Sequence, residues 1–272
     1  MVIKIPFFKH NDVELFYIKE GEGEPLVLLS GLGSKMSWMF QIPYFKEKMM
    51  VIAPHNRGTG KSSRPNYPYK MDMFVEDLKQ LLDHLELKLF HLCGLSMGGM
   101  IALNFILKYP QMVKTLILCA TFAKNHFGAS NSIIEAQKLM VNYDLEHKFK
   151  VRAMALYSRP FRKRLKRDRK LYETLKNEFM EDPTTLQDWI NQGAAVSEHD
   201  TEDLLYIIKQ PTLILTGDDD HIMPTLRFSQ ILNEKIPNSR FEVINGVGHR
   251  FNYEKPEDVN NLLWTFIKEH VK

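Results

Sequence analysis

Six short apolar runs recur along the chain, each followed by a turn rich in glycine or polar residues. They cover residues 25–30, 49–54, 89–96, 114–121, 211–217 and 240–246. Their length and their content of valine, isoleucine and leucine are typical of strands buried on both faces of a parallel sheet. Two further runs, at residues 2–8 and 13–21, predict an antiparallel pair of strands at the start of the chain.

Three segments between these runs have helical periodicity. Apolar residues recur at every third or fourth position over residues 71–86, which predicts a helix with one apolar face. Residues 97–109 are almost wholly apolar and stop at Pro110, so we expect a deeply buried helix there. A third helix is predicted over residues 256–271. This alternation predicts an α/β fold, with a mostly parallel central sheet and helices on both faces.

Residues 122–208 break the alternation, because they contain helical patterns but no strand-like run. The segment is too long for a simple crossover connection. We therefore expect a helical insertion in a core formed by residues 1–121 and 209–272. The aromatic and methionine side chains of the insertion would either line an apolar pocket or pack the insertion onto the core.

The composition is that of an ordinary globular protein, with 44% hydrophobic and 25% charged residues. No apolar run approaches the roughly 20 residues of a membrane span, and the first residues lack a signal-peptide pattern. The two cysteines, Cys93 and Cys119, lie in strand-like runs and are expected to be free buried thiols, which suits the cytoplasm. Because neither Cys-x-x-Cys nor His-Glu-x-x-His occurs, we predict no metal ion and no cofactor.

The net charge of +3 is unevenly distributed. Residues 159–170 contain eight lysines or arginines and one aspartate, so their charge is 8 − 1 = +7. Such a segment could bind nucleic acid, acidic lipid or an anionic ligand. A solvated helix face is the simpler interpretation, so we expect no nucleic-acid partner and no membrane insertion. We expect a monomer or a homodimer.

Ser96 lies in the sequence Gly94-Leu95-Ser96-Met97-Gly98, between a predicted buried strand and a predicted buried helix. In that context Gly-x-Ser-x-Gly predicts a nucleophile elbow, which places a serine with a strained backbone at the carboxyl edge of the sheet. The two glycines leave room for neighbouring elements to approach closely. The following helix directs its positive amino-terminal end to the same point, which favours a developing oxyanion.

A serine hydroxyl needs a base and an acid to become a nucleophile. His249 follows the last predicted strand and is the best placed of the ten histidines. Three adjacent carboxylates, Asp218–Asp220, follow the preceding strand, and spacing alone does not separate them. Asp218 could simply cap a turn. A cation site formed by these carboxylates and His221 would lack a second cluster of ligands.

Two backbone N–H groups are candidates for an oxyanion hole. One belongs to Met97, directly after the serine, and the other to Leu32, in the glycine-rich loop after the first central strand. Such a donor is typically worth about 3 kcal/mol of transition-state stabilisation.

Residues 58–62, Gly-Thr-Gly-Lys-Ser, have the ending of a phosphate-binding loop. A phosphate-binding loop has another glycine five residues before the glycine that precedes the lysine. Here that glycine is Gly60, and position 55 is a histidine. We therefore expect a turn that borders the site, with Arg57 held in local hydrogen bonds, and no nucleotide site.

Over essentially its full length the chain resembles the α/β-hydrolase superfamily. The resemblance rests on residues 56–62 after a strand, on the acid-loop pattern Gly217-x-x-Asp220-x-x-x-Pro224, and on Gly-x-Gly-His at residues 246–249. It implies that Asp220 is the acid. The superfamily usually has aspartate where this chain has His55, a residue that is mostly structural there. Members with a helical lid insert it between the sixth and seventh central strands, which matches residues 122–208.

Residues 30–34 and 93–100 are most similar to the beta-ketoadipate enol-lactone hydrolases and related small carboxylesterases. The expected function is that of a cytoplasmic serine hydrolase with the triad Ser96, His249 and Asp220. It would cleave small-molecule carboxylic esters of small to medium acyl chain. Alternatives are an enol-lactone or C–C bond hydrolase with the same triad, and a non-catalytic hydrolase-like protein that binds a ligand.

Overall fold

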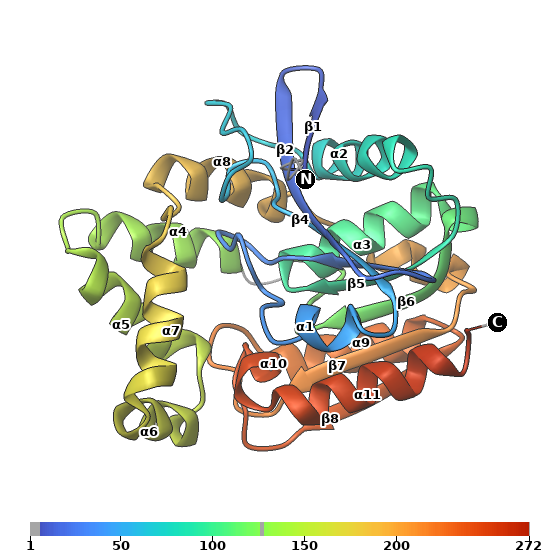
Figure 1. Ribbon diagram of the computed structural model, residues 1–272. Helices are drawn as coiled ribbons and strands as arrows, with labels where there is room; N and C mark the ends of the chain where they lie inside the picture. The colour runs from blue at the N-terminus through green and yellow to red at the C-terminus, as the bar shows by residue number, and fades with distance from the viewer. Residues whose placement is uncertain (1–5, 126–127, 272) are drawn as a thin grey trace.

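The computed structural model describes residues 6–125 and 128–271, so part of the predicted strand at residues 2–8 lies outside the described residues. In the described part, eight strands form one sheet in the order β1-β2-β4-β3-β5-β6-β7-β8 (Figure 1). The strands are β1 (Phe7–His10), β2 (Val13–Glu20), β3 (Pro25–Leu29), β4 (Met50–Pro54), β5 (Phe90–Leu95), β6 (Val113–Cys119), β7 (Thr212–Gly217) and β8 (Ser239–Ile244).

The strand directions confirm the predicted mostly parallel sheet. From β4 and β3 through β8 each neighbouring pair is parallel, whereas β1 pairs with β2 and β2 with β4 in the antiparallel sense. One expectation was wrong, because β8 is not buried on both faces. Arg240 and Glu242 of this strand are exposed, since β8 is the last strand of the sheet and alternates between a covered and an open face.

Helices cover both faces of the sheet (Figure 1). One face packs against α2, α3 and α9, and the other against α1 and α11. The helices in the described part are α1 (Ile42–Phe45), α2 (Met71–His84), α3 (Met97–Lys108), α4 (Ala129–Leu139), α5 (Leu145–Leu156), α6 (Arg159–Arg167), α7 (Arg169–Met180), α8 (Leu186–Ser197), α9 (Thr225–Lys235), α10 (Phe251–Glu254) and α11 (Pro256–Lys268).

Helices α4 to α8 lie between β6 and β7 in the chain. Figure 1 shows α4, α5, α6 and α7 to one side of the sheet instead of on its faces. Several of these helices share an apolar cluster of their own, which includes Phe149, Phe161 and Leu175 and also contains Tyr253 of α10. The basic residues of α6 project from this cluster, because Phe161 and Leu165 are the buried positions of that helix.

Cys93 and Cys119 are buried and free, as predicted. In the part of the chain that the structure describes, no helix is both long enough and apolar enough to cross a membrane.

Candidate active site

Ser96 stands at a strained turn between β5 and α3. Its backbone has φ 56° and ψ −121°, a conformation that L-residues rarely adopt. The turn is tight enough to require its glycines. A Cβ added at Gly94 would lie 2.2 Å from the Gly98 carbonyl oxygen, and one at Gly98 would lie 2.2 Å from that of Leu29. These glycines therefore allow strand, turn and helix to pack closely enough to present the serine.

The imidazole of His249 is held by Asp220. Its Nδ1 donates a hydrogen bond of 2.6 Å to Asp220 Oδ2, and both side chains are almost fully buried. The carboxylate also accepts from the Ile222 N–H at 2.9 Å and from the Thr225 hydroxyl at 3.0 Å. Burial raises the pKa of Asp220, but the charge and hydrogen bond of His249 and the other two donors outweigh it, so this pKa lies below its ordinary value.

The other two carboxylates of the acid loop have different partners. Asp218 accepts a hydrogen bond from the Gly246 N–H at 2.5 Å and so fixes the turn after β8. Asp219 lies 3.1 Å from His221 near the surface. Within residues 6–125 and 128–271, no group of three or more histidine, cysteine, aspartate or glutamate side chains is arranged to hold a metal ion.

Ser96, His249 and Leu32 line one cavity of about 140 Å³, which we call the serine cavity. The rest of its wall is mainly apolar and comes largely from the helices between β6 and β7; it includes Ile133, Ala136, Met140, Val151, Ala155, Leu156, Trp189 and Ile222. No hydrogen bond joins Ser96 Oγ to His249 among the residues described. The serine cavity therefore brings the nucleophile candidate and the base candidate to one space.

Leu32 lines the serine cavity, and Met97 is the first residue of α3, directly after Ser96. The amides on either side of Leu32 are occupied, because the Gly31 N–H donates to Ser37 Oγ at 3.2 Å and the Gly33 N–H donates to Gln192 Oε1 at 2.9 Å. The N–H groups of Leu32 and Met97 have no acceptor among the described residues. The side chain of Met97 is buried in the core, and its amide opens α3 directly after the serine.

The loop after β4 carries the local contacts predicted for it. Arg57 and Asp77 form a buried, two-bonded ion pair with both N–O distances at 2.7 Å. The Lys61 N–H donates to His55 Nδ1 at 3.2 Å. Burial, followed by the charges of Lys35 and Lys61, lowers the pKa of His55 to about 4. His55 is therefore a neutral hydrogen-bond acceptor that shapes the turn.

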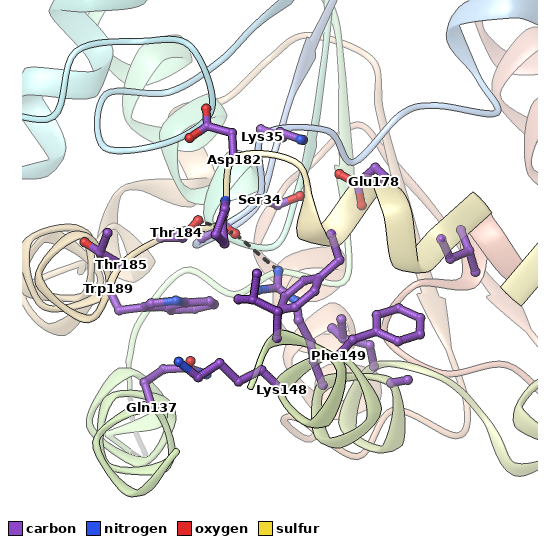
Figure 2. Close-up of a pocket in the computed structure, with 18 of the residues that line it drawn as sticks. Ser34, Lys35, Gln137, Lys148, Phe149, Glu178, Asp182, Thr184, Thr185 and Trp189 are labelled. Carbon is purple, nitrogen blue, oxygen red and sulfur yellow. Dashed lines mark hydrogen bonds between the residues drawn. The ribbon is translucent and has the colours of Figure 1, made fainter. Parts of the chain in front are cut away.

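A second cavity of about 310 Å³, which we call the large cavity, adjoins the serine cavity. Figure 2 draws residues that line the large cavity. Figure 2 shows Lys35, Asp182 and Thr184 on one side of it and the ring of Trp189 from α8 beneath them. The two cavities share six lining residues: Ser34, Gln137, Arg152, Leu156, Trp189 and Arg250. The large cavity therefore lies directly beside the serine cavity, and these six residues border both.

Sequence reasoning missed the two arginines of this shared wall. Arg250 directly follows His249, and that position was the available signal. Arg152 is one of many basic residues in the insertion, and no local pattern distinguishes it, because only the packing of α5 directs it inward.

Glu254 ties the His249 loop to the junction between α5 and α6. Its buried carboxylate accepts from the Gly248 N–H at 2.9 Å, from the Ser158 N–H at 2.8 Å and from the Ser158 hydroxyl. The Arg250 N–H also donates to the Leu156 carbonyl at 3.1 Å. Burial raises the pKa of Glu254 above its ordinary value in spite of these donors. The loop of the base candidate and the α5–α6 junction are therefore held together by the Glu254 carboxylate and by a backbone hydrogen bond.

The fold and the site define the class of protein. A family model described as alpha/beta hydrolase fold matches residues 24–256, and the chain belongs to this family of α/β hydrolases.

Particular relatives have different substrates. The chain is 30% identical to 3-oxoadipate enol-lactonase 2 from Acinetobacter baylyi over 95% of its own length and 94% of the relative's. It is 28% identical to 2-hydroxy-6-oxo-2,4-heptadienoate hydrolase from Pseudomonas putida, over 91% and 90% of the two lengths. Among solved structures, a thermophilic esterase from Thermogutta terrifontis with malate bound superposes with a TM-score of 0.83 at 26% identity, over 96% and 95% of the two chains.

Proposed function

We propose that the protein is a serine hydrolase that cleaves carboxylic esters of small to medium acyl chain. Ser96 is the nucleophile, His249 the general base and Asp220 the residue that orients the imidazole and stabilises its charged form. The observation that carries the proposal is the hydrogen bond of 2.6 Å between Asp220 and His249, because His249 and Ser96 line the same cavity.

In the proposed reaction His249 takes the Ser96 proton as Oγ attacks the ester carbonyl. The N–H groups of Leu32 and Met97 bind the tetrahedral oxyanion, and the same imidazolium then protonates the departing alcohol. A water molecule, activated by His249, releases the acyl group and restores the serine. The unused N–H groups of Leu32 and Met97 support this assignment, because a donor already engaged with the protein would not be available.

We also propose that residues 122–208 act as a lid that forms the substrate pocket. Met140, Val151 and Trp189 come from this segment and line the serine cavity. Their apolar character suits an acyl chain.

Turnover of 4-nitrophenyl acetate and 4-nitrophenyl butyrate tests the proposal. We expect the wild type to release 4-nitrophenol and Ser96→Ala to lose this activity. Ser229→Ala is the matched control. Ser229 is a buried serine of α9, it lines neither cavity, and its hydroxyl has no hydrogen-bond partner among residues 6–125 and 128–271. Equal rates for wild type and Ser96→Ala would contradict the proposal. Labelling by a fluorophosphonate would separate an enzyme from a non-catalytic ligand-binding protein, since a serine without an active base reacts slowly.

A lactone is the second candidate substrate, because the enol-lactonase from Acinetobacter baylyi matches nearly the whole chain. The same three residues would open a lactone ring by the same steps. A panel of esters, lactones and C–C bond substrates, compared by kcat/KM, separates these possibilities.

A further inference from the structure

Two guanidinium groups lie where the serine cavity meets the large cavity. Arg152 comes from α5 and Arg250 from the loop after β8, and each lines both cavities. Arg250 is only 6% exposed. Removing such a charge from water is costly unless an anion compensates it.

Neither guanidinium has a carboxylate partner in the described part of the chain. Arg250 donates to Ser34 Oγ at 2.7 Å and to the Met36 carbonyl at 3.3 Å, both neutral acceptors. Arg152 makes one long hydrogen bond, 3.4 Å, to the Gly33 carbonyl. Its guanidinium also lies 5.0 Å from the ring centroid of Trp189, which provides a π contact but no negative charge.

The charges around the large cavity do not cancel. Its lining contains four cationic residues, Lys35, Lys148, Arg152 and Arg250, against the two carboxylates Glu178 and Asp182. Two of these charges pair with residues outside the lining, Asp182 with Arg64 at 2.6 Å and Lys35 with Glu181 at 3.2 Å, which leaves three cations against Glu178. Burial raises the pKa of Glu178, while the charges of Arg250 and Arg152 oppose this rise, and this one carboxylate does not balance the remaining cations. Burial and the neighbouring Arg250 lower the pKa of Arg152 to about 10, so it remains a cation at neutral pH.

We infer that the substrate carries a carboxylate group, which binds between Arg152 and Arg250 while its ester or lactone carbonyl meets Ser96. The inference rests on the proposed function, in which Ser96 is the nucleophile. Guanidinium groups bind carboxylates through paired, charge-assisted hydrogen bonds, and such bonds are strongest in a site shielded from water. The apolar wall of the serine cavity then accommodates the carbon chain between the two polar ends.

A pair of substrates of equal length tests this inference. The mono-4-nitrophenyl ester of glutaric acid carries a terminal carboxylate, whereas 4-nitrophenyl pentanoate ends in a methyl group at the same place. We expect the wild type to prefer the glutarate ester in kcat/KM by about ten-fold or more, which is the scale of one charge-assisted hydrogen bond. Arg152→Gln should lower kcat/KM for the glutarate ester, mainly through a higher KM, by about ten-fold more than it lowers kcat/KM for the pentanoate ester. Arg152→Lys should keep part of the preference.

Arg167→Gln is the matched control. It removes the same charge from exposed α6, lines neither cavity, and should keep the full preference. Arg152 is the better target, because Arg250 also supports the loop that carries Leu32 through its bond to Ser34. A wild type without preference for the glutarate ester, or an Arg152→Gln variant that lowers both rates equally, would overturn the inference and leave the proposed function standing.

Calorimetric titration of glutarate into Ser96→Ala provides a readout that needs no turnover. Binding that Arg152→Gln abolishes in this background supports the carboxylate subsite, and absence of binding contradicts it. If neither ester is hydrolysed, the proposed function fails and the titration alone decides the inference.

Discussion

The imidazole Nδ1 of His249 lies 2.6 Å from the Oδ2 of Asp220, although 29 positions separate the two residues in the chain. The order of the strands explains why two residues so far apart in the chain lie so close together. Asp220 follows β7 and His249 follows β8, and these strands are parallel neighbours, so their carboxyl ends meet at one edge of the sheet. The hydrogen bond thus favours the tautomer with the proton on Nδ1, and it leaves Nε2 available for the proton that we propose Ser96 gives up.

Asp220→Asn should reduce kcat for 4-nitrophenyl butyrate by about 10³–10⁴-fold, because an amide does not hold the imidazole in the required tautomer or stabilise its cation. Asp219→Asn is the matched control, since Asp219 pairs with the exposed His221 and should keep near wild-type activity. Steady-state kinetics on both variants decide the point. A substantially active Asp220→Asn enzyme would mean that another group orients His249.

Helix α8 lies close to the loop that contains Gly33, and substitution of this glycine measures how tightly the two pack. A Cβ at Gly33 would lie 2.3 Å from the Trp189 ring, and the backbone φ is +61°. Gly246 has a comparable φ of +73° but open space around it. We expect Gly246→Ala to cost about 1 kcal/mol from backbone strain and Gly33→Ala to cost about 1–3 kcal/mol more from the clash. Urea unfolding of the two variants measures the difference, and equal losses would show that the ring moves aside freely.

Gln192 links α8 to two loops of the core. Its side chain donates to the Arg57 carbonyl at 2.7 Å and accepts from the Gly33 N–H at 2.9 Å, in a fully buried position. Gln192→Met should lower the free energy of unfolding by about 3 kcal/mol, because two buried backbone groups lose their partners. Gln187→Met, at an exposed position of the same helix, should change it by less than about 0.5 kcal/mol. Urea unfolding would refute this role for Gln192 if the two variants were equally stable.

His199 should make the fold sensitive to acid. Burial lowers its pKa from 6.5 to about 4, and the Phe122 carbonyl only partly opposes this. Between these values the unfolded chain binds a proton at this position and the folded chain does not, so the stability contributed by His199 is complete above pH 6.5 and falls as the pH drops toward 4. The loss amounts to about 3 kcal/mol at most.

Glutamine can replace both hydrogen bonds of His199, which join it to the Phe122 carbonyl and to the Asn104 amide. His199→Gln should therefore reduce the slope of the unfolding free energy between pH 6.5 and 4 without abolishing it, because the pKa of His55 is lowered over the same range. His221→Gln, at an exposed site, is the control and should leave the slope unchanged. A slope as steep in His199→Gln as in the wild type would assign the acid sensitivity to other groups.

Much of the fold could be predicted because local signals and tertiary structure agree. Buried parallel strands need continuous apolar runs, and a nucleophile elbow needs glycines around its serine, so both are visible in one sequence. The helix at residues 225–235 was not predicted. It is short and has few apolar residues in helical spacing, so its pattern is weak beside those of the two strands that flank it. The exposed face of β8 was missed because a short run of mixed residues does not reveal which strand ends the sheet.

Two parts of the site could not be predicted from the sequence pattern alone: the choice among the three adjacent aspartates and the two arginines that line the cavities. Spacing could not separate Asp218, Asp219 and Asp220, since the choice depends on which loop turns toward His249. Only the resemblance to the superfamily selected Asp220. Arg152 and Arg250 were not identified, because a buried arginine and an exposed one have the same appearance in a sequence.

The carboxylate of Glu254 has a consequence for how molecules reach Ser96. Because it holds both Gly248 and Ser158, displacement of the α5–α6 junction would pull the neighbouring His249 out of register with Asp220. A molecule that reached the serine cavity by displacing this junction would therefore also disturb the base candidate. The helices between β6 and β7 and the His249 loop are thus coupled through a single buried carboxylate.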